Sequence, residues 1–236
     1  MNILFISIAW PSPGSGNLYS DLMEEFVSHG HRVHVAASHR GDDKRSQDHT
    51  EENGISVLRI PAGKIMKTSR LRKASSLVTL GGKLRKAIYQ HFGKEHYDLI
   101  IAHTPSITLS VLYRKLKRRY GAPLYLLLKD MWPQGSVDHG VFRKFSPPWI
   151  YFRIHEKRLY RVADFIGTMS PKGAEYLLAK NSYLPENKVE VCPNSIRPAK
   201  RLSAKPGEKI RDKYGIPRDA CIFLFSGNLG IGHGLH

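Results

Sequence analysis

The alternation of two kinds of segment predicts an α/β protein with a doubly wound, parallel sheet. Short runs of β-branched and apolar residues alternate with longer segments that carry apolar residues at helical spacing. The first run, at residues 2–9, is almost continuously apolar, which is typical of a strand covered on both faces. Such alternation implies right-handed crossovers and a sheet whose ligands bind beyond the carboxyl ends of its strands.

The first elements are closely spaced. A Pro/Gly loop at 10–16 follows the opening strand, and a helix then continues until Gly30 ends it. Further strands are expected at 31–37 and 55–60. The polar, charged segment 38–53 between these strands is expected to be a loop outside the core.

The remaining elements continue the alternation. Strands are expected at 98–103, 123–129, 164–169 and 188–192. Helices are expected at 69–92, 107–120, 149–162 and 171–181. Gly81 and Gly82 are expected to kink the first of these helices, and Ser170 and Pro171 are a suitable cap and first residue for the last.

The composition changes near residue 195, which divides the chain into three parts. Residues 1–195 are expected to form one Rossmann-like domain, and 196–208 have the composition of a linker. Residues 209–236 would begin a second domain with a short helix at 209–214 and a strand at 221–226. These few elements cannot bury their own faces, so we expect the second domain to be truncated.

The composition is that of an ordinary globular protein with a basic surface. The chain has 236 residues with 37 Lys+Arg against 20 Asp+Glu, a formal net charge of +17, and 41% of its residues are hydrophobic. The two cysteines, Cys192 and Cys221, are too few for a disulfide framework or a zinc site. Without a basic leader or a run of about 18 apolar residues, the protein is expected to be cytoplasmic. Its charge calls for an anionic partner.

A glycine loop between the first strand and the first helix is a candidate phosphate site. It consists of Gly14, Ser15, Gly16 and Asn17. Backbone N–H groups and a helix N-terminus can approach a phosphate there, although a tight loop that merely connects two elements is an equal alternative. Two of the three glycines of the dinucleotide fingerprint are present, and no acidic residue ends the second strand, so NAD is not the expected ligand.

Polar residues end two strands at the edge where such sheets bind ligands. Lys129 and Asp130 directly follow an apolar run. The lysine can neutralise a diphosphate and the carboxylate can hold a hydroxyl or take its proton, unless the two form an ion pair that caps the strand. His103 ends another strand and either binds a substrate hydroxyl or is a partly buried histidine bonded to backbone.

No metal site is expected from the sequence. His29, His31 and His34 are close together but fall across a helix end and a strand, not on one face. The chain also lacks an HExxH motif, a GxxxxGK[ST] loop and a GxSxG elbow. These absences disfavour zinc proteases, P-loop nucleotide hydrolases and α/β-hydrolases.

A basic amphipathic segment predicts contact with an anionic membrane surface. Its cations are Lys67, Arg70, Arg72, Lys73, Lys83, Arg85 and Lys86. Its apolar side is expected to carry Leu77, Val78, Leu80 and Leu84. Each Lys or Arg near anionic lipid contributes about 1 kcal/mol, whereas the alternative is an ordinary solvated face. Because the chain has no recognised nucleic-acid motif, a nucleic-acid partner is not the expected one and is kept only as an alternative.

Six motifs together resemble the amino-terminal half of a retaining family 4 glycosyltransferase, whose GT-B fold has two Rossmann-like domains. They are NILFI at 2–6, SHGHRV at 28–33, YDLIIAH at 97–103, KDMWP at 129–133, VEVCPNS at 189–195 and FSGNLG at 225–230. Their order and spacing extend over nearly the whole chain. The Asp-x-Trp-Pro signature is most similar to the branch that builds capsular polysaccharide and O-antigen, including fucosamine-type transferases.

The resemblance implies transfer of a sugar from a nucleotide diphosphate sugar to an acceptor, with retention at the anomeric carbon, in a cleft between two domains. The amino-terminal domain would hold the acceptor. In this family Gly14 and Gly16 would approach the donor phosphates or the transferred sugar, and Asp130 and His103 would orient hydroxyls. The donor site would be opened by Gly227, Asn228 and Gly230.

These expectations describe the acceptor half of a transferase that needs no cofactor or metal. Its partners would be a nucleotide-sugar donor, a lipid-linked or glycan acceptor at the inner face of the membrane, and a carboxyl-terminal domain that this chain lacks. Alone, the chain should turn over little or not at all. Two alternatives remain open from the sequence: an NAD-dependent nucleotide-sugar epimerase and a non-catalytic basic nucleic-acid-binding protein.

Overall fold

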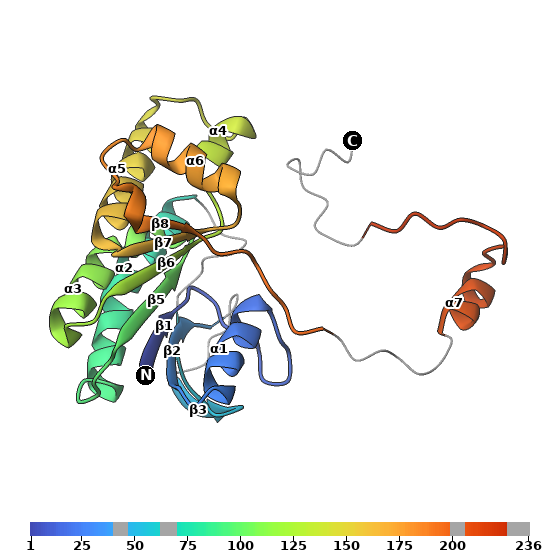
Figure 1. Ribbon diagram of the computed structural model, residues 1–236, viewed down its shortest axis with the longest axis horizontal. Coiled ribbons are helices and arrows are strands. Elements are labelled where there is room, and N and C mark those ends of the chain that lie inside the picture. Colours follow the sequence, from blue (N-terminus) through green and yellow to red (C-terminus); the bar gives the residue numbers. More distant parts are fainter. Residues whose placement is uncertain (40–46, 62–69, 199–205, 226–236) are drawn as a thin grey trace. The chain divides into compact units, whose positions relative to one another are not determined.

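The computed structural model contains two compact units, Met1–Ile196 and Arg197–His236 (Figure 1). It describes residues 1–39, 47–61, 70–198 and 206–225; of these, the side chains of 70–78 and 206–209 lie outside the description. The assignment of 196–208 as a linker and of 209–236 as the start of a second domain stays a prediction.

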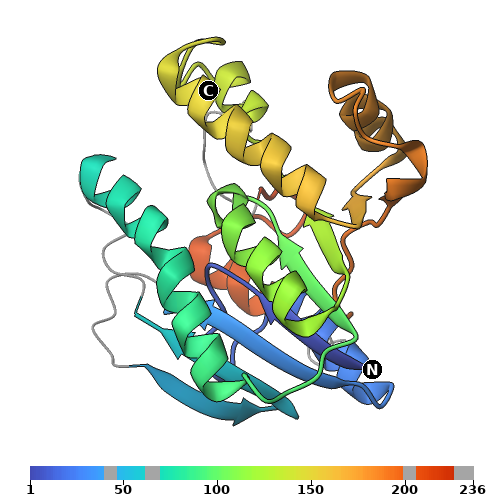
Figure 2. The same cartoon turned by 90° about the vertical axis from the view of Figure 1, so that its left-hand side faces the viewer.

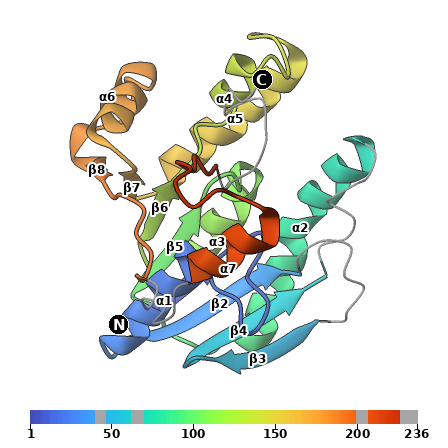
Figure 3. The same cartoon turned by 90° about the vertical axis from the view of Figure 1, so that its right-hand side faces the viewer.

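The first unit is built on an eight-stranded sheet with the order β3-β4-β2-β1-β5-β6-β7-β8 (Figure 3). The strands are β1 Asn2–Ile6, β2 Arg32–Ser38, β3 Asp48–Glu52, β4 Ile55–Ile60, β5 Leu99–His103, β6 Leu124–Leu128, β7 Phe165–Thr168 and β8 Val189–Val191. Every neighbouring pair is parallel except β3 and β4. The predicted fold class is therefore confirmed.

Helices cover both faces of the sheet. They are α1 Leu18–Ser28, α2 Arg70–His91, α3 Ser110–Tyr120, α4 Gln134–Asp138, α5 Pro147–Val162 and α6 Pro171–Lys180, with 3-10 turns at Ile107–Leu109 and Glu186–Lys188. Figure 2 shows α2, α3 and α5 side by side on one face, while α1 packs on the other. The short helix α4 was not expected, because its sequence QGSVD has no apolar period. No helix within the described ranges is long and apolar enough to cross a bilayer.

The period-two alternation of β1 explains how one strand serves two cores. Leu4 and Ile6 belong to the cluster beneath α2, α3 and α5, and Ile3 and Phe5 belong to the cluster beneath α1. All four side chains are fully buried. A central parallel strand buried on both faces explains the continuous apolar run from which the fold class was predicted.

The apolar stripe of α2 belongs to the protein core. Leu80, Leu84 and Ile88 are fully buried and pack with residues of α3 and the sheet. The expectation that Leu80 and Leu84 face a membrane is therefore wrong, because the helix needs them to hold itself to the sheet. The helix also continues through Gly81 and Gly82 without interruption. The structure does not describe the side chains of Leu77 and Val78, the other two apolar residues predicted on this side of the helix.

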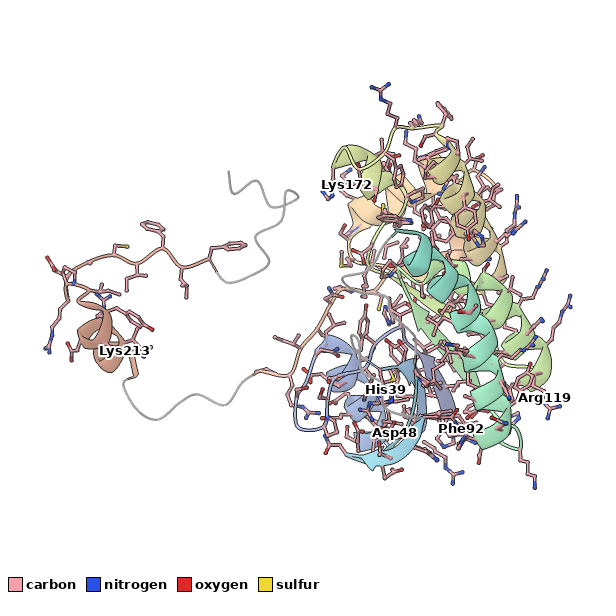
Figure 4. The ribbon with its side chains drawn as sticks, turned by 180° about the vertical axis from the view of Figure 1, so that it is seen from behind. His39, Asp48, Phe92, Arg119, Lys172 and Lys213 are labelled. Atoms are coloured by element: carbon pink, nitrogen blue, oxygen red, sulfur yellow. The ribbon has the colours of Figure 1, made fainter. Side chains whose placement is uncertain are left out.

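Strand β3 is a correction to the predicted loop at 38–53. Its sequence DHTEE contains no apolar residue, so no hydrophobic period could indicate a strand. It is held by antiparallel pairing with β4 and by Arg59, whose guanidinium donates to Thr50 Oγ1 at 3.1 Å and to Glu52 Oε2 at 2.8 Å. Figure 4 shows His39 and Asp48 beside each other at this end of the sheet, with Nε2 and Oδ1 4.0 Å apart.

In the second unit, α7 spans Pro206–Tyr214, so it begins earlier than the expected 209–214. The strand expected at 221–226 is absent from the described part of that segment, residues 221–225. Phe223 and Leu224 are 95% and 85% exposed there. A strand requires a neighbour for its backbone groups, and the described part of this unit supplies none.

Candidate functional site

The polar residues singled out in the sequence gather at the carboxyl edge of the sheet. Strand β5 lies between β1 and β6, so the ends of these three strands are adjacent. Ser7 directly follows β1, His103 is the last residue of β5, and Lys129 and Asp130 follow β6. The glycine loop and the start of α1 follow β1 at the same edge. The topology therefore places the predicted catalytic residues in one region.

His103 is buried and both of its ring nitrogens have partners. Its Nδ1 donates to the carbonyl oxygen of Thr104 at 2.8 Å, which leaves Nε2, 2.8 Å from Ser7 Oγ, as the unprotonated nitrogen in the neutral ring. Burial lowers the pKa of His103 to about 4, and the nearby Lys129 charge lowers it further. The imidazole is therefore neutral near pH 7, and its side chain is not available to a hydroxyl in solution.

Tyr19 of α1 covers the buried histidine. The two rings are stacked with centroids 4.2 Å apart, and Phe5 stacks with the same histidine at 5.7 Å. Burial and the charge of Asp130 raise the pKa of Tyr19 to about 12. Tyr19 was missed in the sequence because its contacts come from strands far along the chain. The one available signal was its position in the first turn of a helix that starts at this edge.

Thr104 holds the segment that carries Asp130. Its buried hydroxyl oxygen accepts the backbone N–H groups of Lys129 and Asp130, both at 2.8 Å. One side chain at the end of β5 thus fixes the backbone at the end of β6. This residue was also missed, since nothing in the sequence shows which strand end a threonine will meet.

Lys129 and Asp130 do not form the ion pair that was the alternative reading. The Lys129 ammonium group donates to the carbonyl oxygen of Cys192 at 3.1 Å, and burial lowers the pKa of this lysine. Asp130 is exposed, and among the described residues its carboxylate has no hydrogen bond or ion pair. The edge therefore presents one accessible carboxylate on a fixed backbone.

The glycine loop mainly supports its own helix. Asn17 is the cap of α1 and accepts the N–H groups of Tyr19 at 2.9 Å and Ser20 at 3.0 Å. The N–H of Asn17 donates to Ser20 Oγ at 2.8 Å, and the N–H of Ser15 donates to the carbonyl oxygen of Ser12 at 3.0 Å. Four donors that a phosphate would use are thus occupied.

The cavity beside this loop is also acidic. Its volume is about 260 Å³, and Gly14 and Ser15 line it together with Glu24, Glu51 and Glu52. Gly14 has a φ of +80°, which suits glycine. Glu52 is ion-paired with Arg59, and Glu24 accepts a hydrogen bond from Asn53 Nδ2 at 2.8 Å. A phosphate in this cavity would meet negative charge, which disfavours the cavity as a phosphate site.

Several predicted site residues cannot be placed. Gly227, Asn228, Gly230 and Lys67 lie outside the described residues. Arg70, Arg72 and Lys73 belong to α2, but the description does not include their side chains. Lys83 and Lys86 are exposed and Arg85 is half-buried. Among the described residues no group of three or more His, Cys, Asp or Glu could hold a metal ion, and the absence of a metal or cofactor stays a prediction.

Solved structures share this fold at low sequence identity. An OtsA apo structure matches with a TM-score of 0.60 and 10% identity, over 84% of this chain and 50% of its own. A structure from E. coli described as trehalose-6-phosphate bound with UDP-2-fluoro glucose matches with a TM-score of 0.58 and 11% identity, over 90% and 54%. Apo UGT2 from Phytolacca americana matches with a TM-score of 0.52 and 14% identity, over 90% and 55%.

The chain thus spans about half the length of these structures. Their likeness supports the predicted Rossmann-like amino-terminal half. No curated protein sequence matches the chain significantly. The model of one protein family, described as the glycosyl transferase 4-like domain, matches residues 14–195, which include the glycine loop, His103, Lys129 and Asp130. The chain therefore belongs to the glycosyl transferase 4-like family.

Proposed function

We propose that this chain is the acceptor-binding half of a retaining glycosyltransferase in cell-surface polysaccharide synthesis. The whole enzyme would transfer a sugar from a nucleotide diphosphate sugar to a lipid-linked glycan acceptor at the cytoplasmic face of the membrane. The family match supports sugar transfer. Among the structural neighbours, the E. coli structure and a Phytolacca americana UGT2 structure are described with UDP-2-fluoro sugars, which supports a nucleotide sugar as the donor.

The observation that carries the proposal is the exposed Asp130 on a backbone fixed by Thr104. A carboxylate at the ligand-binding edge can accept a hydrogen bond from a sugar hydroxyl and can take its proton during transfer. Asp130 would thus orient an acceptor or sugar hydroxyl. His103 acts as a positioning residue because Tyr19 covers it, which revises the direct contact that the resemblance implied.

Lys129 would contribute positive charge toward a diphosphate leaving group. Its ammonium group donates a hydrogen bond to the carbonyl oxygen of Cys192. In this arrangement the lysine would stabilise the diphosphate through its positive charge at a distance, without contacting it directly. The predicted donor contacts of Gly14, Gly16, Gly227, Asn228 and Gly230 stay part of the proposal. No cofactor and no metal are needed in it, because the nucleotide sugar is a co-substrate.

The test is a ligand titration of the isotope-labelled chain followed by NMR. The probe is a water-soluble, short-chain prenyl-diphosphate-linked N-acetylhexosamine, and the amides of residues 103–104 and 129–134 should shift on binding. Asp130→Asn should weaken binding about tenfold, the loss of one hydrogen bond to a charged group. Glu175→Gln, a neutralisation on the exposed face of α6, is the matched control and should bind as wild type.

Two parallel titrations address the alternatives. NADH binding with shifts around the glycine loop would favour an epimerase. Tight binding of duplex or single-stranded DNA with a steep salt dependence would favour a nucleic-acid-binding protein. Either result, with no binding of the prenyl-diphosphate sugar, would overturn the proposal.

A further inference from the structure

The first unit exposes a group of large apolar side chains at one end. We call these residues, in the connection from α4 to α5 and the first turns of α5, the apolar patch: Val141, Phe145, Ile150, Tyr151 and Ile154. They are 66%, 67%, 45%, 43% and 44% exposed, respectively. Single exposed apolar residues are common on soluble proteins, but five within residues 141–154 are a concentration that suggests a partner.

Helical spacing places the apolar patch in line with positive charge. Ile150, Tyr151 and Ile154 share one face of α5, and the exposed Arg158 and Arg161 continue this face toward the end of the helix. Figure 1 shows the first turns of α5 beside α4, at the end of the first unit away from β3. The helix thus presents an apolar stretch followed by a basic one.

The surroundings of the apolar patch are basic as well. Arg143 and Lys144 are exposed beside it. Within residues 141–162 the one acidic residue is Glu156, which is 5% exposed and ion-paired with Arg153. The exposed charge within residues 141–162 is therefore positive, which complements an anionic surface and disfavours another basic protein face.

We propose that the apolar patch is the surface by which this protein docks on an anionic lipid bilayer. Aromatic and aliphatic side chains would enter the boundary between head groups and acyl chains, while the flanking arginines and lysines meet lipid phosphates. The patch differs from the described part of the α2 stripe, where Leu80, Leu84 and Ile88 are buried in the core. This inference rests on the proposed function in one respect, the membrane location of the acceptor.

A cavity connects the apolar patch to the candidate site. It has a volume of about 570 Å³ between α4, α5 and α6, and its lining includes Lys144, Phe145 and Trp149. Met131 and Pro133, which closely follow Asp130, line it too. Docking here would therefore hold a lipid-linked acceptor close to Asp130.

The test is co-sedimentation of the full chain with vesicles, without any sugar nucleotide. Vesicles of mixed phosphatidylglycerol and phosphatidylcholine should bind the wild type more weakly as salt rises, and pure phosphatidylcholine should bind it less at every salt concentration. Phe145→Ser with Ile150→Gln should lower partitioning into the anionic vesicles roughly tenfold or more. The matched control, Lys83→Gln with Lys86→Gln on α2, should change it less than about twofold.

Three outcomes would overturn the proposal. In the first, the Phe145/Ile150 variant binds vesicles as well as wild type, and in the second, the α2 variant loses more binding. In the third, the wild type shows no vesicle binding but a concentration-dependent dimer that the Phe145/Ile150 variant abolishes, which would make the patch an interface between copies. If that variant fails to fold, Val141→Ser in the loop replaces it. Asp130→Asn should leave vesicle binding unchanged, so failure of the acceptor titration is distinguishable from failure here.

Discussion

His103 and Asp130 stand at the ends of neighbouring strands, yet they have opposite environments. His103 is 5% exposed with both ring nitrogens bonded, whereas Asp130 is exposed on a segment fixed through Thr104. Both had looked like ligand-binding residues because each follows an apolar run at the ligand edge. The difference shows that two strand ends at one edge of a sheet can have different roles: His103 is part of the core, whereas Asp130 is accessible to a ligand.

The largest expected effect separates these two residues by stability. His103→Ala removes two hydrogen bonds and the ring stacked between Phe5 and Tyr19, so it should lower the free energy of unfolding by about 4 kcal/mol. Asp130→Ala should change it by less than about 0.5 kcal/mol. Urea denaturation monitored by circular dichroism measures both. Equal losses in the two variants would break the comparison.

The second prediction concerns pH. The pKa of His103 in the folded protein, about 4, lies below its ordinary value of 6.5, because burial disfavours the charged ring. Between these values the unfolded chain binds the additional proton, so stability falls as the pH falls from 6.5 toward 4. This residue alone should account for about 3 kcal/mol of that loss.

The control for the pH experiment is His103→Gln, which cannot titrate. Its unfolding free energy should fall less steeply over the same range. Some slope should remain, since burial also lowers the pKa of His34. An unchanged slope in His103→Gln would show that the ring is not buried neutral in the folded protein.

The third prediction sharpens the link between the two strand ends. Thr104→Val leaves the N–H groups of Lys129 and Asp130 without their acceptor and should lower the free energy of unfolding by about 2 kcal/mol. Amide hydrogen exchange at residues 129 and 130 should become faster. Thr104→Ser keeps the hydroxyl and should recover most of both effects. Unchanged exchange in Thr104→Val would mean that another group fixes the loop.

Patterns of apolar residues were sufficient to predict the parallel strands of the core, but they did not predict the elements that depart from this pattern. Strand β4 has the expected bounds 55–60, because a short, mostly apolar run rich in β-branched residues is typical of a buried strand. Strand β3 escaped detection because backbone pairing forms it without an apolar period. In α5, Leu159 and Tyr160 are buried like the described apolar residues of α2, whereas Ile150, Tyr151 and Ile154 are exposed. Periodicity shows that a helix has an apolar face but not whether the fold covers that face.

The candidate site was predictable in outline only. Placing Lys129, Asp130 and His103 at one edge required strand order, which the alternation of elements supplies. The roles of Thr104 and Tyr19 depend on contacts between residues far apart in the chain, which a single sequence does not contain. Asn17 was assigned to phosphate binding although its position before the helix equally suits a cap, the role that the structure gives it.

The two outermost strands of the sheet have a consequence for solubility. Strand β3 carries Asp48, Glu51 and Glu52, and β8 is only three residues long. A strand with unpaired backbone groups is a template on which another chain can add itself, and acidic side chains or a very short strand discourage such addition. The two edges of the sheet therefore discourage aggregation in two different ways. Under the proposed membrane docking, which would raise the local concentration of the protein, this protection would matter most.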